Sequence, residues 1–372
     1  MNAAPIQFPN VLYWQARFFS ATRGVWRRLA DIESGVVREE IEAVAIDKPI
    51  FVTGLARAGT TILTEMLEQH PDATSHHYSD FPNVWTPYWR NYLLQRSRRT
   101  RPSLEERAHR DRIMVSADSP EAVEELLWMH FFPLCHAQGQ DNRLGREHAQ
   151  PEFDDFYRDH IRKMLCIRSA RRYLAKGNYN VLRLAYLKHL FPDFRVLIPY
   201  RDPVDHIASL AKQHRLFVEQ HRLNPRIGRM LSLNGHFEFG PHRKAVCFGD
   251  YAEWQATQHA WRAGREVEGW AHYWSACYRY LLEHTHDDQA LAAACRFISY
   301  ERLCEQSGDA IDEILSHCAL DTVPFQDQRT RYSHTLSRPD YYAPQFTAAE
   351  RETIRSLCDP VKTALDERSR AT

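Results

Sequence analysis

A short apolar run followed by a turn between two glycines constrains this chain most. Residues 51–63 read FVTGLARAGTTIL, in which Gly54 and Gly59 keep the G-x-x-x-x-G spacing of a phosphate-binding loop. Glycine lets the backbone turn sharply, so that successive N–H groups and a helix N-terminus converge on one anion. The segment therefore predicts a buried strand, a loop that binds phosphate or sulfate, and a helix that begins at Thr60.

This glycine loop (residues 54–59) departs from the loop of nucleoside triphosphatases, which carry a lysine where Thr60 stands here. The lysine is absent and the cation lies inside the loop as Arg57, which argues against ordinary ATP hydrolysis. A glycine-rich turn without a ligand is the alternative, but a cation and two hydroxyls favour an anion site. The residues that we expect to bind the anion are Arg57, Ala58, Gly59, Thr60 and Thr61.

A second junction between a strand and a helix lies later in the chain. The run RVLIPY (195–200) predicts a buried strand, and Asp202 followed by Pro203 predicts the start of a helix. Arg201 then lies at the C-terminal end of the strand, where ligands bind in open α/β sheets, and Ser209 lies about two helical turns beyond. An arginine and a hydroxyl suit a second phosphate, although this motif on its own favours Asp202 as a helix cap and Arg201 as its surface salt-bridge partner.

Strands that alternate with helical segments predict an α/β fold class, a P-loop-like parallel sheet flanked by helices and carrying helical insertions. We expect an N-terminal helical extension over 1–47, an α/β domain over 48–320 and a C-terminal tail over 321–372 that packs on the domain. We also expect a helix that begins at Asp118 and a short strand over 179–183.

Charge and cysteine content exclude several classes of function. Lys+Arg and Asp+Glu both number 48, so no general affinity for nucleic acid or for an anionic membrane is indicated. The eight cysteines include no C-x-x-C pair, and we predict neither a metal site nor a disulfide framework. No targeting segment and no run of about 20 apolar residues is evident, so we expect a soluble, cytoplasmic protein without a membrane span.

The two junctions, in this order, resemble those of the sulfotransferase family, whose enzymes use 3′-phosphoadenosine 5′-phosphosulfate. The similarity runs from about residue 49 to residue 305 and is closer to bacterial and carbohydrate- or tyrosine-type members than to the cytosolic phenol enzymes. It implies that the glycine loop binds the 5′-phosphosulfate and that Arg201 and Ser209 bind the 3′-phosphate.

The resemblance assigns two further residues. Lys176, in the stretch LAKGNYN, matches the lysine that contacts the bridging or sulfonate oxygens, and Tyr300, in FISYERL, matches a tyrosine near the adenine. The phenol branch carries its catalytic histidine two residues after the lysine, where this chain has Asn178. Asparagine accepts no proton at neutral pH, so that histidine mechanism is not implied for this chain.

Three residues are candidates for the group that accepts a proton from the acceptor. The tyrosine and heparan branches place a glutamate just after the first helix, which corresponds here to HPDATSHHYSDFP. His77 matches an acidic position of the tyrosine branch, whereas Asp80 resembles the acidic–aromatic step of the heparan branch. We prefer His77, because histidine titrates near pH 6.5. Glu124, beside Glu125, is the third candidate, and each of the three would otherwise be a solvated or core residue.

The sequence therefore predicts a sulfotransferase that moves a sulfuryl group to a hydroxyl of a carbohydrate, lipid or small molecule, without a metal ion. A P-loop nucleotide kinase or hydrolase is one alternative, which the missing loop lysine opposes. A catalytically lapsed nucleotide-binding protein is another, which Asn178 supports. The partners that we predict are the nucleotide co-substrate and the acceptor, with no nucleic acid, and the aromatic surplus permits a homodimer.

Overall fold

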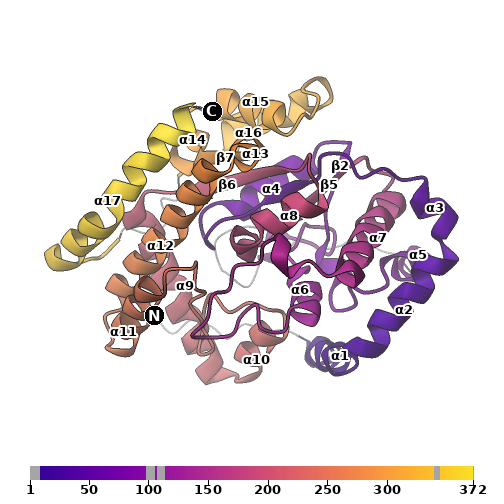
Figure 1. The fold of residues 1–372 in the computed structure, drawn as a ribbon, viewed down its shortest axis with the longest axis horizontal. Coiled ribbons are helices and arrows are strands. Elements are labelled where there is room, and N and C mark those ends of the chain that lie inside the picture. The colour runs from indigo at the N-terminus through magenta and orange to yellow at the C-terminus, as the bar shows by residue number, and fades with distance from the viewer. Residues whose placement is uncertain (1–8, 98–104, 107–113, 339–343, 372) are drawn as a thin grey trace.

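The computed structural model describes residues 9–97, 105–106, 114–338 and 344–371, and its sheet confirms the α/β fold class. Five parallel strands lie in the order β2-β5-β1-β6-β7. Helices α9, α12 and α17 lie towards the β6–β7 end of this sheet, and α2, α5 and α7 lie towards the other end (Figure 1). The bounds of the strands are β1 Ile50–Val52, β2 Ala73–Thr74, β5 Arg172–Lys176, β6 Arg195–Tyr200 and β7 Cys295–Ser299, with β3 Glu105–Glu106 and β4 Met114–Val115 forming a separate antiparallel pair.

The helices follow the strands in the alternation that the sequence predicts. The α-helices are α1 Asn10–Ala21, α2 Arg23–Val36, α3 Arg38–Glu42, α4 Thr60–Glu68, α5 Pro87–Ser97, α6 Glu125–Phe131, α7 Pro151–Arg168, α8 Leu184–Leu190, α9 Pro203–Leu223, α10 Arg226–Leu233, α11 Tyr251–Arg262, α12 Glu266–Asp287, α13 Gln289–Ala294, α14 Tyr300–Glu305, α15 Ser307–His317, α16 Gln326–Thr335 and α17 Ala348–Ala371. Short 3₁₀ helices are η1 Tyr78–Asp80, η2 Arg146–His148, η3 Asn178–Leu182 and η4 Val323–Phe325. None of the helices in the described part of the chain combines the length and the apolar character that a membrane-spanning segment needs.

The central strands have apolar interiors because both faces of the sheet are covered. Phe51 packs in the core on one face, and its neighbours Ile50 and Val52 pack in the core on the other. Strand β1 lies between β5 and β6, with Phe51 opposite both Ala175 and Val196. Continuous apolar runs are typical of such buried parallel strands. The C-terminal ends of β5, β1 and β6 therefore meet at one edge, where the glycine loop and Arg201 follow.

Two local predictions were wrong. The helix expected from Asp118 begins only at Glu125, because the backbone before it is held by long-range bonds, among them the one that Glu121 N–H donates to His76 at 2.8 Å. The strand expected over 179–183 is the 3₁₀ helix η3, since the strand β5 ends two residues earlier, at Lys176. The chain then leaves the sheet through Gly177, whose N–H donates to the carbonyl of Val52 at 3.1 Å.

The N-terminal helices are fastened to the rest of the molecule by a buried ion pair. Glu33 of α2 accepts a hydrogen bond from Lys163 Nζ of α7 at 3.0 Å, and both side chains are fully buried. Glu33 also accepts from the backbone N–H of Trp89 at 2.7 Å. Burial raises the pKa of Glu33, and burial lowers the pKa of Lys163. Helix α2 is therefore tied to both α7 and α5.

Candidate active site

The glycine loop joins β1 to α4 through backbone conformations that favour glycine. Gly54 and Gly59 have φ values of +150° and +109°, and Arg57 also has a positive φ of +72°. A Cβ on Gly59 would lie 2.6 Å from Cδ2 of Tyr300, so the loop and the start of α14 are in close contact. The N–H of Ala58 turns back to the carbonyl of Leu55 at 3.2 Å. Glycine is favoured at position 59 for two reasons: its φ is positive, and the ring of Tyr300 occupies the place where a Cβ would lie.

The second junction meets the loop from the neighbouring strand. Nε of Arg57 donates to Oγ of Ser209 at 3.3 Å, and Nη1 of Arg201 donates to the carbonyl of Arg57 at 3.4 Å. The Arg201 guanidinium lies over the ring of Tyr300, with Cζ 5.1 Å from the ring centroid. Asp202 is the N-cap of α9 and accepts from the N–H of Val204 at 2.9 Å. Asp202 thus serves the helix start, while Arg201 turns towards the loop.

Arg201 is 7% exposed, and its Nε has no hydrogen-bond partner among the described residues. A buried guanidinium N–H without an acceptor is costly, so an anionic ligand beside it would be stabilising.

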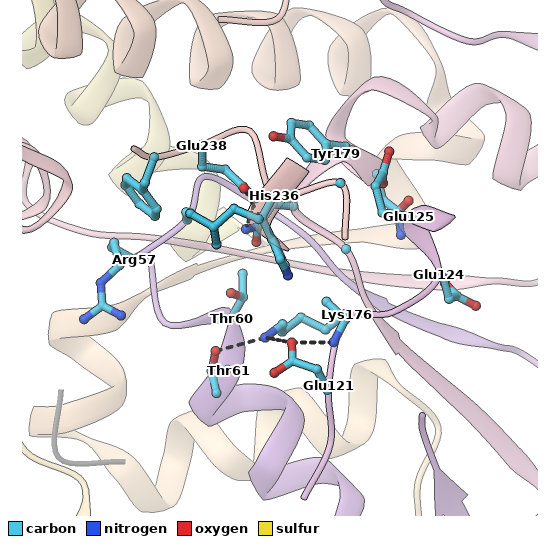
Figure 2. A pocket seen from close by; sticks show the side chains of 18 of the residues that line it. Arg57, Thr60, Thr61, Glu121, Glu124, Glu125, Lys176, Tyr179, His236 and Glu238 are labelled. Carbon is cyan, nitrogen blue, oxygen red and sulfur yellow. Dashed lines mark hydrogen bonds and ion pairs between the residues drawn. The ribbon is translucent and has the colours of Figure 1, made fainter. Parts of the chain in front are cut away.

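Lys176 lies at the C-terminal end of β5 and faces the start of α4. Its Nζ is 3.2 Å from Oγ1 of Thr61 and 3.5 Å from Oε1 of Glu121 (Figure 2). Burial would raise the pKa of Glu121, but the Lys176 ammonium and His236 lower it to about 2. The Lys176 ammonium therefore keeps the carboxylate of Glu121 ionised beside the glycine loop. A carboxylate at this place was not predicted from the sequence.

A cavity opens beside the loop and brings these groups together (Figure 2). Apolar side chains of α6, α9 and the segment after α10 make much of its wall. Charged and polar groups enter it from the loop, from β5 and from residues 235–238. Its lining includes Arg57, Thr60, Thr61, Glu121, Trp128, Lys176, Asn178, Phe217, Leu231, His236, Glu238 and Phe239. Such a mainly apolar hollow with a few convergent polar groups is typical of small-molecule sites.

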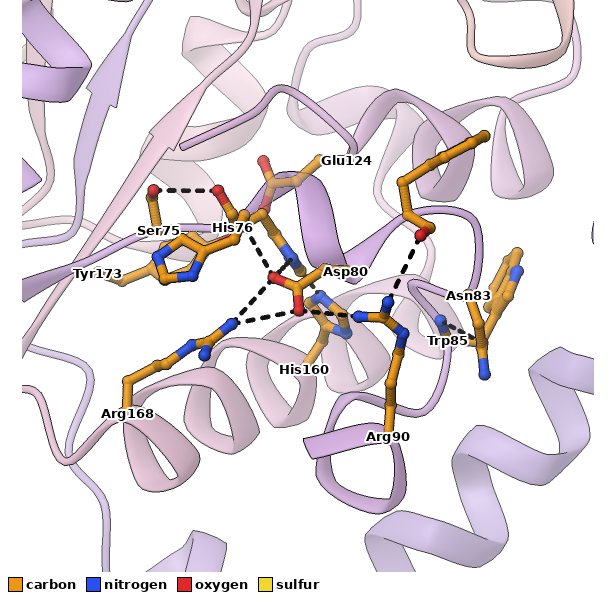
Figure 3. Close-up of polar contacts among 12 residues, drawn as sticks. Ser75, His76, Asp80, Asn83, Trp85, Arg90, Glu124, His160, Arg168 and Tyr173 are labelled. Atoms are coloured by element: carbon orange, nitrogen blue, oxygen red, sulfur yellow. Dashed lines mark hydrogen bonds and ion pairs between the residues drawn. The ribbon is translucent and has the colours of Figure 1, made fainter. Parts of the chain in front are cut away.

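The structure places His77 and Asp80 away from this cavity, and neither is among the described residues that line it. Nε2 of His77 lies 2.7 Å from a carboxylate oxygen of Glu68. Figure 3 shows Asp80 between Arg168 and Arg90, and each guanidinium lies 3.2 Å from Oδ1. Burial would raise the pKa of Asp80, but His76 and Arg168 hold it well below its usual range. The geometry therefore gives Asp80 structural partners.

Glu124 borders the cavity, but its carboxyl group lies between two tyrosines. Oε1 accepts from the hydroxyl of Tyr157 at 2.9 Å and from that of Tyr173. Burial raises the pKa of Glu124. In Figure 2 the carboxyl group points away from Lys176, which leaves this third base candidate without a direct path to the loop.

Glu125 is the centre of a second buried cluster. It accepts from both Nη atoms of Arg183, at 2.6 and 2.8 Å, and from His136 at 2.6 Å. Burial disfavours the imidazolium, but the Glu125 carboxylate raises the pKa of His136 to about 9. Within the described residues, Glu125, Cys135 and His136 are the one group spaced closely enough to hold a metal ion. The Arg183 guanidinium already neutralises the carboxylate and would repel a cation there.

Sequence reasoning missed three titratable residues that line the cavity. Glu121 belongs to an apparent helix-capping segment, and His236 and Glu238 lie in a polar stretch that looks like a surface excursion. The sequence signal for two of them is a neighbouring glycine: His236 and Glu238 follow Gly235, whose φ is +76°. A Cβ at Gly235 would lie 2.5 Å from Cγ of Glu125, so this glycine permits the loop to approach α6.

Comparisons with known proteins identify the family and the fold. The model of the sulfotransferase family matches residues 49–232, about half of the chain. The chain is similar in structure to the sulfotransferase STF1 from Mycobacterium tuberculosis, with a TM-score of 0.50 and 18% identity over 92% of this chain and 85% of STF1. For STF9 from Mycobacterium avium the TM-score is 0.47, with 14% identity over 88% of this chain and 81% of STF9.

Among curated proteins, none matches the chain significantly. The family match spans the glycine loop, Lys176, Arg201 and Ser209, and the similarity to STF1 shows a shared fold. The chain therefore belongs to the sulfotransferase family of transferase enzymes.

Proposed function

We propose that the protein transfers a sulfuryl group from 3′-phosphoadenosine 5′-phosphosulfate to a hydroxyl acceptor. The observation that carries the proposal is the contact of Arg57 with Ser209 and of Arg201 with the loop backbone. Two anion-binding motifs thereby meet at the C-terminal edge of the sheet, as a nucleotide with two separate anionic groups requires. Tyr300, under Arg201, adds an aromatic face on which a base can stack.

The glycine loop and the N-terminus of α4 offer N–H groups to the 5′-phosphosulfate. Thr60 and Thr61 add hydroxyl donors, and Lys176, which contacts Thr61, adds a cation. Sulfuryl transfer resembles phosphoryl transfer in spreading negative charge over peripheral oxygens, so preorganised cations and N–H groups stabilise its transition state. We assign that stabilisation to Arg57, Lys176 and the loop amides.

The cavity beside Lys176 is the proposed acceptor site. Trp128, Phe217, Leu231 and Phe239 give it an apolar wall, and Lys176, Glu121 and His236 are among its polar lining residues. A pocket of this kind buries the apolar body of an organic molecule and orients one polar group. An alcohol of a lipid, a carbohydrate or another small molecule fits that description.

Binding of the reaction product tests the nucleotide site directly. Adenosine 3′,5′-bisphosphate should raise the unfolding temperature of the wild-type protein, since a ligand at about 100 times its Kd stabilises by about 2.7 kcal/mol. Arg201→Ala should remove most of this stabilisation, whereas Arg262→Ala, at an exposed position of α11, should retain it. No stabilisation of the folded wild type by millimolar bisphosphate would defeat the proposal, and a larger effect of magnesium-ATP would favour a kinase.

A further inference from the structure

Residues 234–239, between α10 and α11, form a loop that is hydrogen-bonded to residues that line the cavity. The N–H of His236 donates to the carbonyl of Leu231 at 2.9 Å, and the N–H of Phe237 donates to the hydroxyl of Tyr179 at 3.2 Å. The side chain of Asn178 donates from Nδ2 to Oε1 of Glu238 at 2.9 Å. This 234–239 loop is thus held against η3, the segment that directly follows Lys176.

His236 and Glu238 form a pair within this loop. Nδ1 of His236 lies 3.7 Å from Oε2 of Glu238, so Nε2 is the ring nitrogen left to face the cavity. Both side chains line the cavity together with Lys176 and Glu121 (Figure 2). The imidazole extends towards the Lys176–Glu121 ion pair in that view, beside the start of α4.

The charges around the imidazole favour its protonated form. Burial lowers the pKa of His236, but the carboxylates of Glu238 and Glu121 raise it above its ordinary value, and Lys176 opposes them. Because its pKa lies above the ordinary value, the ring of His236 takes up a proton more readily than a free imidazole does, which suits a general base. Glu121 is a weak base, because its own pKa is about 2.

We propose that His236 is the catalytic residue that accepts the proton of the acceptor, and that Glu238 is the positioning residue that orients its ring. The proposal rests on the proposed function. As the acceptor oxygen forms its bond to sulfur, its proton passes to Nε2 of His236. The bond from sulfur to the bridging oxygen breaks at the same time, and the electron pair leaves with the nucleotide phosphate.

This assignment relocates the base within the site. Asn178 stands where the phenol-type enzymes that this chain resembles carry a histidine, and here it binds Glu238 instead. The 234–239 loop instead places the imidazole of His236 in the same cavity. This loop follows η3 at a distance of 58 residues in the chain, counted between the bonded residues Tyr179 and Phe237. His77, the candidate preferred from the sequence, contacts the carboxylate of Glu68 and is not among the described residues that line the cavity.

The test measures transfer of a radiolabelled sulfuryl group from 3′-phosphoadenosine 5′-phosphosulfate to para-nitrophenol, hexanol, glucose and water. His236→Gln should lower kcat at least about 100-fold, a loss typical of a general base, with affinity for adenosine 3′,5′-bisphosphate unchanged. His242→Gln, at an exposed position of the same chain segment, is the matched control and should retain wild-type turnover. His77→Gln tests the rival candidate and should also retain turnover.

The pH profile separates a base from a merely structural residue. Turnover of the wild type should rise with pH through the pKa of His236, and Glu238→Gln should move this limb to lower pH, because a carboxylate that favours the imidazolium is removed. The same shift should appear in NMR titration of the His236 ring protons, identified by their loss in His236→Gln.

Each other outcome has a definite meaning. Wild-type turnover in His236→Gln, or its loss in His77→Gln instead, overturns the assignment of the base while the proposed function stands. An unmoved pH limb in Glu238→Gln overturns the positioning role. Failure of the wild type to bind the bisphosphate, or to transfer the label to any of the four acceptors, overturns the proposed function and this inference with it.

Discussion

Nε of Arg57 lies 3.3 Å from Oγ of Ser209, although 152 residues separate them in the chain. One residue comes from the turn after β1 and the other from the second turn of α9, which follows β6. Because β1 and β6 are neighbours in the sheet, two separate sequence motifs come into hydrogen-bond contact.

Ser209→Ala tests whether Ser209 binds the 3′-phosphate of the nucleotide. Loss of one hydrogen bond to a charged group should weaken the binding of adenosine 3′,5′-bisphosphate by about 10- to 150-fold and leave that of adenosine 5′-monophosphate unaffected. Calorimetric titration with both nucleotides gives the ratio of affinities. Ser316→Ala, at an exposed position of α15, is the control. Equal weakening of both nucleotides would contradict a 3′-specific role.

Gly59→Ala should damage the site through the clash with Tyr300. Both Gly59 and Gly264 have positive φ values, so alanine at either position adds backbone strain of about 1 kcal/mol or more. Only at Gly59 would the new Cβ meet an aromatic ring at 2.6 Å, since nothing lies within 4 Å at Gly264. Nucleotide affinity should fall in Gly59→Ala alone, while urea unfolding reports the strain in both. Unchanged affinity in Gly59→Ala would show that the ring moves aside freely.

The buried pair of Glu33 and Lys163 should be costly to break. Lys163→Met leaves the Glu33 carboxyl buried without its cation, and the free energy of unfolding should fall by about 3–5 kcal/mol. The double variant Glu33→Gln with Lys163→Met should recover part of this loss. Arg338→Met, which removes the exposed partner of Glu305, should cost less than about 1 kcal/mol. Urea unfolding of the four proteins checks the prediction, and a loss in Lys163→Met no larger than in Arg338→Met would refute it.

His136 should make stability depend on alkaline pH. Its pKa of about 9 in the folded protein lies above the ordinary value near 6.5, so its pairing with Glu125 contributes fully below about pH 6.5 and is lost as pH rises through 9. His136→Gln should therefore lower stability much more at about pH 6 than at about pH 10. His334→Gln, at an exposed position, controls for general effects of the substitution. An equal loss at both pH values would mean that His136 acts by packing alone.

The junctions around β1 and β6 could be predicted because their signals are local. Both strands are buried on two faces and read as continuous apolar runs, and the turn after β1 needs glycine at Gly59. The grouping of Arg57, Arg201 and Ser209 followed from strand order, since parallel strands end at one edge. The resemblance to sulfotransferases added Lys176, which does line the cavity.

The acid–base groups could not be predicted, because distant contacts decide where they lie. The segment from Asp118 has the pattern of a helix start, yet Glu121 N–H pairs with His76 and its carboxylate pairs with Lys176. His236 lies in a polar stretch without periodicity, and hydrogen bonds from its loop to Leu231, Tyr179 and Asn178 bring it to the cavity. No local pattern distinguishes it from the other histidines of the chain.

The pairing of β1 with β6 fixes the distance between the glycine loop and the start of α9, the two junctions that we propose bind the nucleotide. Val52 lies opposite Leu197, and the N–H of Thr53 extends this ladder to the carbonyl of Leu197 at 3.0 Å, immediately before the glycine loop. Neighbouring strands lie about 4.8 Å apart, so hydrogen bonds between main chains set the spacing of the two proposed anion sites. On the proposed function, side-chain changes there would alter the affinity for the nucleotide, whereas a change of strand register would alter the distance between the two proposed anion sites.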